Sequence, residues 1–214
     1  MTNNDLNTLV DFLNNHVRPM YFSLDRGHDE YHYDEVLKTA IKLSYFYNIS
    51  DIDLISLIVA SAYHDTGRIV ADKGHEDISV KIFKRDLHLK EFLEETFPKI
   101  KYKNILRKGI KIIKNHGSSN KTKDELSLIL QDADKISHLN KERFISRSVG
   151  YYLDRRYTNE SKTEIVSNKI LSIGGSITFT PKSKAMKYIL GKENTININI
   201  TSSDIELVVN KLFN

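Results

Sequence analysis

The amino-acid sequence predicts an all-α protein with a small α+β extension at its C-terminal end. Along most of the chain, apolar residues recur at intervals of three and four, the period of a helix with one buried face. Up to residue 172 there is neither an internal repeat nor a low-complexity linker. Beyond it, a glycine pair and an alternation of isoleucine with polar residues change the pattern. We therefore expect a helical domain over residues 1–172 and an extension over 173–214 that packs on it.

Helices are expected wherever the helical period continues. In the second of them, His32, Val36 and Leu43 lie on one face, so the imidazole should point toward the core. The third contains the most apolar run of the protein, from Leu54 to Tyr63, and should be buried. The predicted helices cover residues 5–16, 32–47, 51–65, 76–85, 89–96, 103–115, 124–139, 141–155 and 160–171.

The extension should contain both helices and strands. A short helix can begin at Pro181 and continue to about Leu190, and the residues from Ser202 can cap a final helix that ends at Phe213. Segments 176–179 and 195–200 have the pattern of strands and should pair as a small hairpin or sheet. Three roles stay open for this part of the chain: shaping a pocket, forming a homodimer interface, or neither.

The composition is that of a soluble globular protein. The chain has 214 residues, of which 28% are charged and 40% hydrophobic, and it has no cysteine, so no disulfide framework is possible. Its first residues lack the basic start and apolar run of a signal peptide. The longest apolar run is about ten residues, too short for a membrane span. We expect a cytoplasmic protein without a membrane partner.

The positive charge is uneven along the chain. The net charge is +4, and the stretch 99–123 is rich in lysine without any acidic residue. Leu106, Ile110 and Ile113 give that stretch an apolar stripe, so the lysines are interpreted as the solvated face of an amphipathic helix. Attraction of a polyanionic substrate is the alternative. Nucleic acid is not expected as a partner, because Tyr102 is the only aromatic residue available for stacking there.

Side chains of the kind that bind metals stand in three predicted helices: His32, the adjacent pair His64 and Asp65, and Asp134. Two imidazoles and two carboxylates suit a divalent ion such as Mn, Fe, Co, Ni, Zn or Mg. Because the three segments are distant in the sequence, such a site would be assembled by folding.

The pair His64 and Asp65 closes the most apolar run of the chain. A buried, unpaired carboxylate is costly to desolvate, and a bound cation would remove that cost. The alternative is that Asp65 caps the next turn, beside Gly67, while His64 is a hydrogen-bonded core residue.

Asp134 lies beside the apolar stripe of its helix, whereas Asp132 is expected to point outward. An aspartate in such a position is most often a solvated surface residue. The combination with the two histidines is what favours a metal site.

Local motifs in a fixed order resemble those of the HD-domain metal-dependent phosphohydrolases. They are GHDEYHYDEV at 27–36, AYHDTG at 62–67, HEDIS at 75–79, IIKNH at 112–116 and QDADK at 131–135. The resemblance covers about residues 20 to 140 and is strongest to small bacterial single-domain members that act on nucleotides. It implies an HD-type helical bundle in which one divalent ion is held by His32, His64, Asp65 and Asp134. His28 is not assigned to the metal, because it lies in a polar turn before the first ligand.

The resemblance also implies roles for residues around the metal. His75 and His116 fall where some relatives place ligands of a second ion; contact with substrate phosphate is favoured, so one ion per chain is expected and two remain possible. Arg68 stands where several members carry a carboxylate, which favours a longer phosphate chain over a monophosphate. Arg26 and Lys135 are further candidates for holding phosphate, with a solvated surface role as the alternative.

The expected activity is hydrolysis of a nucleoside or deoxynucleoside triphosphate to the monophosphate and pyrophosphate. Asp65 and His64 would be the catalytic residues, and the ion would activate water near neutral pH. The alternatives are a 5′-nucleotidase, a cyclic or dinucleotide phosphodiesterase with a binuclear site, and a non-catalytic module that senses a nucleotide. The small-molecule nucleotide is the only partner that we expect, apart from a possible second copy of the chain.

Overall fold

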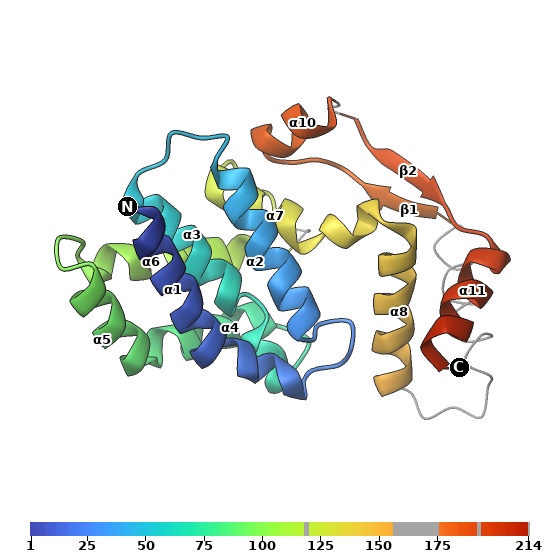
Figure 1. Cartoon of the computed structure of the whole chain (residues 1–214), viewed down its shortest axis with the longest axis horizontal. Helices are drawn as coiled ribbons and strands as arrows, with labels where there is room; N and C mark the ends of the chain where they lie inside the picture. The colour runs from blue at the N-terminus through green and yellow to red at the C-terminus, as the bar shows by residue number, and fades with distance from the viewer. Residues whose placement is uncertain (118–119, 156–175, 192–193, 214) are drawn as a thin grey trace.

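The computed structural model describes residues 1–117, 120–155, 176–191 and 194–213, and the predicted helix at 160–171 lies outside them. Helices dominate, and a two-stranded sheet stands at one end of the molecule (Figure 1). The helices are α1 (Asn3–His16), α2 (Glu30–Ser44), α3 (Asp51–Tyr63), α4 (His75–Arg85), α5 (Leu87–Thr96), α6 (Tyr102–Asn115), α7 (Glu125–Asp134), α8 (Lys141–Arg155), α10 (Lys184–Leu190) and α11 (Ser202–Phe213). Short 3₁₀ helices are η1 (Arg18–Ser23), η2 (Thr66–Ile69) and η3 (Ile136–Leu139).

The predicted all-α fold with a small α+β extension is confirmed. Strand β1 (Ser176–Phe179) pairs with β2 (Ile196–Asn199) in antiparallel register, with Ser176 opposite Asn199 and Phe179 opposite Ile196. Division of the chain at residue 172 stays a prediction, because that residue lies outside the described part.

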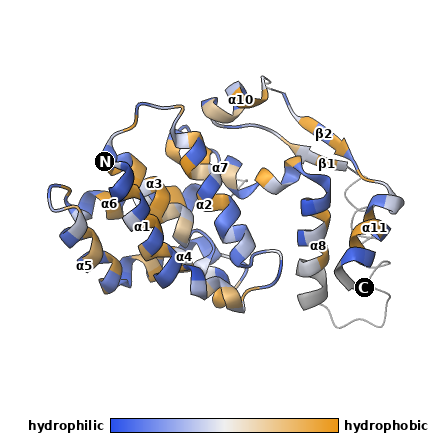
Figure 2. Ribbon diagram, viewed as in Figure 1, coloured by the Kyte–Doolittle hydropathy of each residue, from blue (hydrophilic) through white to orange (hydrophobic). Residues whose placement is uncertain are grey.

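Helix α3 lies at the centre of the main core, as its composition predicts. The Ser50 side chain caps its first turn by accepting a hydrogen bond from the backbone N–H of Asp53. Every residue from Ile55 to Tyr63 is buried, and the neighbouring α2, α6 and α7 all pack against the helix. Figure 2 shows the resulting concentration of apolar residues in α3. Burial of a helix on several sides fixes its C-terminal end, where His64 and Asp65 follow, deep in the protein.

A second, smaller core joins α8 to the C-terminal segments. It is formed by Ile145, Val149, Ile177, Ile200, Ile205, Val208 and Val209. In contrast, Phe179, Ala185 and Met186 pack into the main core. The C-terminal segments therefore contact both cores, with α8 as one wall of the smaller one.

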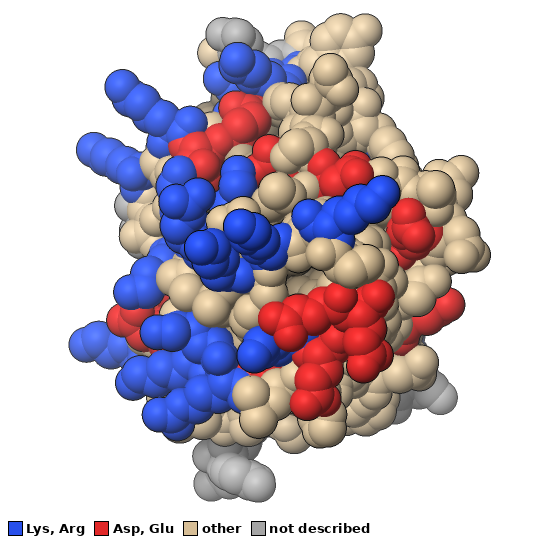
Figure 3. Space-filling view, turned by 90° about the vertical axis from the view of Figure 1, so that its left-hand side faces the viewer, with Lys and Arg blue, Asp and Glu red and all other residues tan. Residues whose placement is uncertain are grey.

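The lysine-rich helix α6 is paired with acidic residues from other elements. Lys114 contacts Asp77 of α4 at 3.1 Å, Lys111 contacts Asp124 at 2.6 Å, and Lys108 contacts Asp53 of α3. Figure 3 shows basic and acidic side chains gathered on separate parts of the face at this end of the molecule. The three Lys–Asp pairs support the interpretation of α6 as a solvated lysine face more than a role in attracting a polyanionic substrate. In the part of the chain that the structure describes, no helix is both long and apolar enough to traverse a bilayer.

Candidate metal centre

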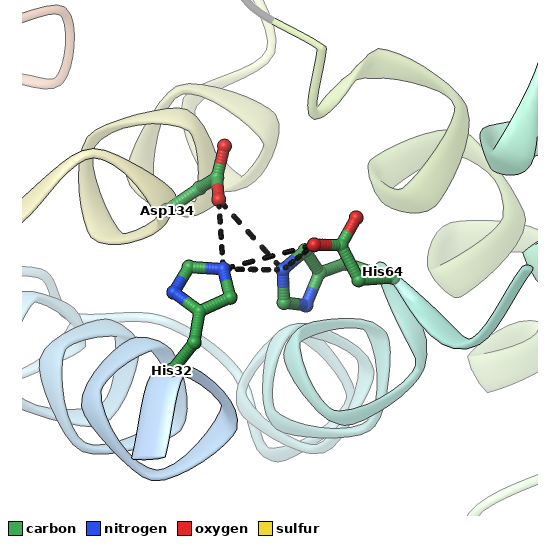
Figure 4. Close-up of side chains that lie close together, drawn as sticks. His32, His64 and Asp134 are labelled. Carbon is green, nitrogen blue, oxygen red and sulfur yellow. Dashed lines mark hydrogen bonds and ion pairs between the residues drawn. The ribbon is translucent and has the colours of Figure 1, made fainter. Parts of the chain in front are cut away.

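Three helix ends bring the four predicted metal ligands together. Figure 4 shows three of them, His32, His64 and Asp134, with their side chains directed toward one another. His32 lies in the first turn of α2, and its backbone N–H donates a hydrogen bond to the side chain of Asp29, the residue that caps this helix. His64 and Asp65 link the end of α3 to η2, and Asp134 is the last residue of α7. The continuous helix predicted over 124–139 is wrong, because α7 ends at Asp134 and η3 follows after Lys135.

The ligand atoms of this first group lie close to one another. The Nε2 atoms of His32 and His64 are 3.4 Å apart, and Oδ1 of Asp134 lies 3.1 Å from the first and 3.8 Å from the second. Oδ2 of Asp65 is 3.4 Å from Nε2 of His64 and 3.7 Å from that of His32. Ligands at roughly 2.1 Å from one ion are separated by distances of this size. The group therefore has the dimensions of a single metal site.

The environment of the group also fits a cation. The side chains of His32, His64 and Asp65 are at most 2% exposed, whereas that of Asp134 is 21% exposed. Neither oxygen of Asp65 accepts a well-directed hydrogen bond in the described part of the chain. Burial alone would raise the pKa of the Asp65 carboxyl, but the neighbouring His64 and Arg68 hold that pKa well below its usual range. A buried, ionised carboxylate without directed donors is what a bound divalent ion would balance.

Backbone carbonyls orient three histidine rings toward Asp65. Nδ1 of His64 lies 2.8 Å from the carbonyl oxygen of Ser61. The corresponding distance is 2.7 Å from Nδ1 of His75 to the carbonyl of Asp72, and 2.7 Å from Nδ1 of His116 to the carbonyl of Ile113. A neutral ring that donates from Nδ1 presents an unprotonated Nε2, the tautomer that metal binding requires. In His64 this orientation prepares Nε2 to bind a cation, whereas in His75 and His116 the same Nε2 can donate to a phosphate oxygen when the ring is protonated.

A second group of ligand atoms shares Asp65 with the first. Nε2 of His75 lies 3.1 Å from Oδ1 of Asp65, Nε2 of His116 lies 3.6 Å from it, and the two nitrogens are 3.2 Å apart. Oδ2 of Asp65 belongs to the first group. The two oxygens of one carboxylate therefore face two different histidine pairs.

Gly67 explains how His75 comes so near to Asp65. A Cβ atom at this position would lie 2.1 Å from the carbonyl oxygen of His75 and 2.7 Å from the backbone nitrogen of Ser79. The Ser79 hydroxyl accepts a hydrogen bond from the N–H of Gly67 and donates one to the His64 carbonyl. The start of α4 is thus fixed against the turn that carries the first group.

Arg68 occupies the same side of Asp65 as the second group. Its Nε lies 2.8 Å from Oδ1 of Asp65, and an Nη atom contacts Asp72 at 3.1 Å. The prediction of a cation beside the pocket is consistent with this position. The guanidinium competes with any second ion for Oδ1, because both require the same oxygen.

The other predicted residues belong to neither ligand group. Arg26 is exposed and Lys135 is partly buried. Nδ1 of His28 lies 2.9 Å from Oδ1 of Asp25, and the His28 ring stands edge-on to that of His32, so it lines the site without joining either group.

The prediction that Asp132 points outward is wrong. It is 1% exposed, and its carboxylate accepts hydrogen bonds from the backbone N–H groups of Lys182 and Ser183. Burial raises its pKa. The C-terminal segments are thereby attached to α7 two residues before Asp134. Sequence periodicity missed this contact because the partner lies fifty residues further on.

Two polar residues near the site also escaped prediction. Gln131 donates from Nε2 to the carbonyls of Gly117 and Asn120, which joins α7 to the backbone at those two residues. Arg147 of α8 donates to the carbonyl of Gly27 and to the hydroxyl of Ser137. Gln131 opens the motif at 131–135, but only Asp134 and Lys135 of that motif have predicted roles, and Arg147 stands in none of the five motifs.

Comparison with known families identifies the chain. The HD domain model matches residues 30–139, just over half of the sequence and the stretch that holds both ligand groups. The protein therefore belongs to the HD domain family, whose members are in general metal-dependent phosphohydrolases. No curated protein and no solved structure matches the chain.

Proposed function

We propose that the protein hydrolyses a nucleoside or deoxynucleoside triphosphate to the monophosphate and pyrophosphate. One divalent ion would be held by His32, His64, Asp65 and Asp134. The observation that carries the proposal is the convergence of these four ligands, buried on all sides except that of Asp134. When bound, the ion supplies activation of water and neutralises phosphate charge.

The substrate would enter on the side of Asp134, the only ligand of the first group with an accessible side chain. Lys135 follows it directly, and the charge of Lys182 is close enough to interact with both residues. Basic groups at the entrance favour an anionic substrate, which supports a phosphorylated compound.

Within the site, the two oxygens of Asp65 would serve two different groups. Asp65 directs Oδ2 to the metal group and Oδ1 to His75, His116 and Arg68. These three side chains would hold a phosphate oxygen and place the phosphorus atom beside the ion. Charge that develops on the phosphates would be balanced by the Arg68 guanidinium.

A second candidate function is phosphodiester hydrolysis by a binuclear site, which the Asp65, His75 and His116 group favours. Against it stands Arg68, whose Nε already contacts Oδ1 of Asp65 at 2.8 Å. A guanidinium at that place gives the carboxylate a second cationic neighbour without a second ion. We therefore prefer the mononuclear proposal.

Substrate preference tests the proposal. Metal-loaded protein is expected to release pyrophosphate from triphosphates faster than it releases phosphate from monophosphates. The ratio of the triphosphate rate to the monophosphate rate should fall by about tenfold to a hundredfold in the Arg68→Ala protein, because one charge-assisted contact to the phosphates is lost. A nucleotide panel, with phosphate and pyrophosphate quantified separately at saturating metal, gives the comparison.

The exposed Arg107 on α6 provides the control. Arg107→Ala should leave the preference unchanged. If monophosphates are the better substrates of the wild-type protein, a 5′-nucleotidase replaces our proposal; if cyclic or dinucleotides are, the binuclear phosphodiesterase does. A protein that binds nucleotides without turnover would instead be a sensor.

A further inference from the structure

Arg147 lies on α8, beyond the residues that match the HD domain model. Its neighbours Ile145 and Val149 are buried in the smaller core. Residues two positions apart on a helix point in nearly opposite directions, so Arg147 faces away from that core. Gly150, one turn later, allows close approach, because a Cβ atom there would lie 2.3 Å from that of Arg26. Helix α8 therefore presents Arg147 to the segment that precedes the first metal ligand.

Hydrogen bonds hold the guanidinium between two segments of the site. Nε donates to the carbonyl of Gly27 at 2.7 Å, and an Nη atom donates to the hydroxyl of Ser137 at 2.8 Å. Gly27 lies in the turn before α2, which carries His32, and Ser137 lies three residues after Asp134. These acceptors are neutral and use two of the five N–H donors of an arginine. The positive charge is thus fixed in place by groups that do not neutralise it.

The charge of Arg147 reaches the metal centre. Although burial lowers the pKa of Arg147 itself, Asp134, Asp65 and then Glu35 act to raise it. A divalent ion would neutralise the carboxylates of Asp65 and Asp134. These two groups would then no longer offset the positive charge of the Arg147 guanidinium. An anionic ligand is the species that would restore it.

The same side of the centre is open to solvent. Arg147 is partly exposed, as is Asp134, whereas the other ligands of the first group are buried. Ser137, which holds the guanidinium, lies three residues after Asp134, so a ligand that enters beside Asp134 would approach the guanidinium as well. Arginine suits phosphate oxygens in particular, because its planar donors can bind two of them.

We propose that Arg147 binds a phosphate group of the substrate, so that a helix outside the matched HD region completes the binding site. This inference rests on the proposed function for the identity of the ligand. Arg147 would contact a phosphate that enters beside Asp134. Arg68 and Arg147 would then hold different parts of a phosphate chain.

Binding of inorganic tripolyphosphate to the metal-loaded protein, measured by calorimetry, tests the inference. Arg147→Gln should weaken binding by about tenfold to a hundredfold and raise KM for triphosphates more than for monophosphates. Arg147→Lys should recover part of the affinity, because it keeps the charge. The matched control is Arg143→Gln, one turn earlier on α8, where the guanidinium lies 3.7 Å from Glu35; its affinity should equal that of the wild type.

Unchanged tripolyphosphate affinity in Arg147→Gln, or an equal loss in Arg143→Gln, would overturn the inference. If Arg147→Gln does not fold, phenylglyoxal labelling of wild-type protein decides: tripolyphosphate should protect Arg147 and not Arg143, and labelling of Arg147 without protection refutes the assignment. The two proposals fail separately. Arg147-dependent binding without nucleotide turnover would reject only the proposed function, whereas turnover with Arg147-independent binding would reject only the inference.

Discussion

Replacing Asp65→Asn is expected to abolish turnover and the retention of metal. Asp65 directs one oxygen to each histidine pair, so its neutral isostere weakens both groups at once. The loss should be on the order of a thousandfold or more in kcat, which corresponds to about 4 kcal/mol of transition-state stabilisation. Elemental analysis of the purified variant, together with the turnover assay, gives both readouts.

His28→Ala is the matched control for Asp65→Asn. Its imidazole is also near the centre, but it pairs with Asp25 and belongs to neither ligand group. The control should retain stoichiometric metal and most of its activity. If the Asp65→Asn protein holds stoichiometric metal and turns over normally, the assignment of the site is wrong.

Removal of the metal by a chelator is expected to abolish activity and to lower the melting temperature by about 5–10 °C. An ion present at a hundred times its dissociation constant stabilises the folded state by about 2.7 kcal/mol. In a protein of this size, each kcal/mol corresponds to roughly 2–4 °C. Circular dichroism during heating, with and without chelator, measures the difference.

The Asp65→Asn protein serves as the reference for the chelation experiment, because it should have no ion to lose. Its melting temperature should therefore respond little to the chelator, and re-addition of metal should restore only the wild type. An equal shift in both proteins would mean that the chelator acts elsewhere.

Local patterns in the sequence were sufficient to predict most of the framework of the site. The apolar run before His64 predicts burial of α3, and the structure has every residue from Ile55 to Tyr63 buried. The spacing of His32, Val36 and Leu43 predicts that the imidazole faces inward, and all three side chains are buried. The alternation of isoleucine with polar residues predicts that the two C-terminal strands pair, and β1 and β2 do pair, with α10 in the connection between them. Each of these features depends on residues within one segment.

Features that depend on contacts between distant segments could not be predicted in this way. Asp132 is buried because the backbone of Lys182 and Ser183 donates to it, and helical periodicity within α7 carries no record of that partner. Arg147 lies near the centre because α8 turns back against the loop at Gly27. The shared position of Asp65 between two histidine pairs likewise appears only when the segments are folded together.

Anomalous diffraction from crystals of the metal-loaded protein, recorded at the absorption edge of the bound metal, tests the central claim most directly. We predict one strong peak within coordination distance of Nε2 of His32 and His64 and of the carboxylates of Asp65 and Asp134. A second peak of equal height beside Oδ1 of Asp65, His75 and His116 would contradict the mononuclear account. A peak located away from the first group, or none in protein that turns over substrate, would contradict the metal centre itself.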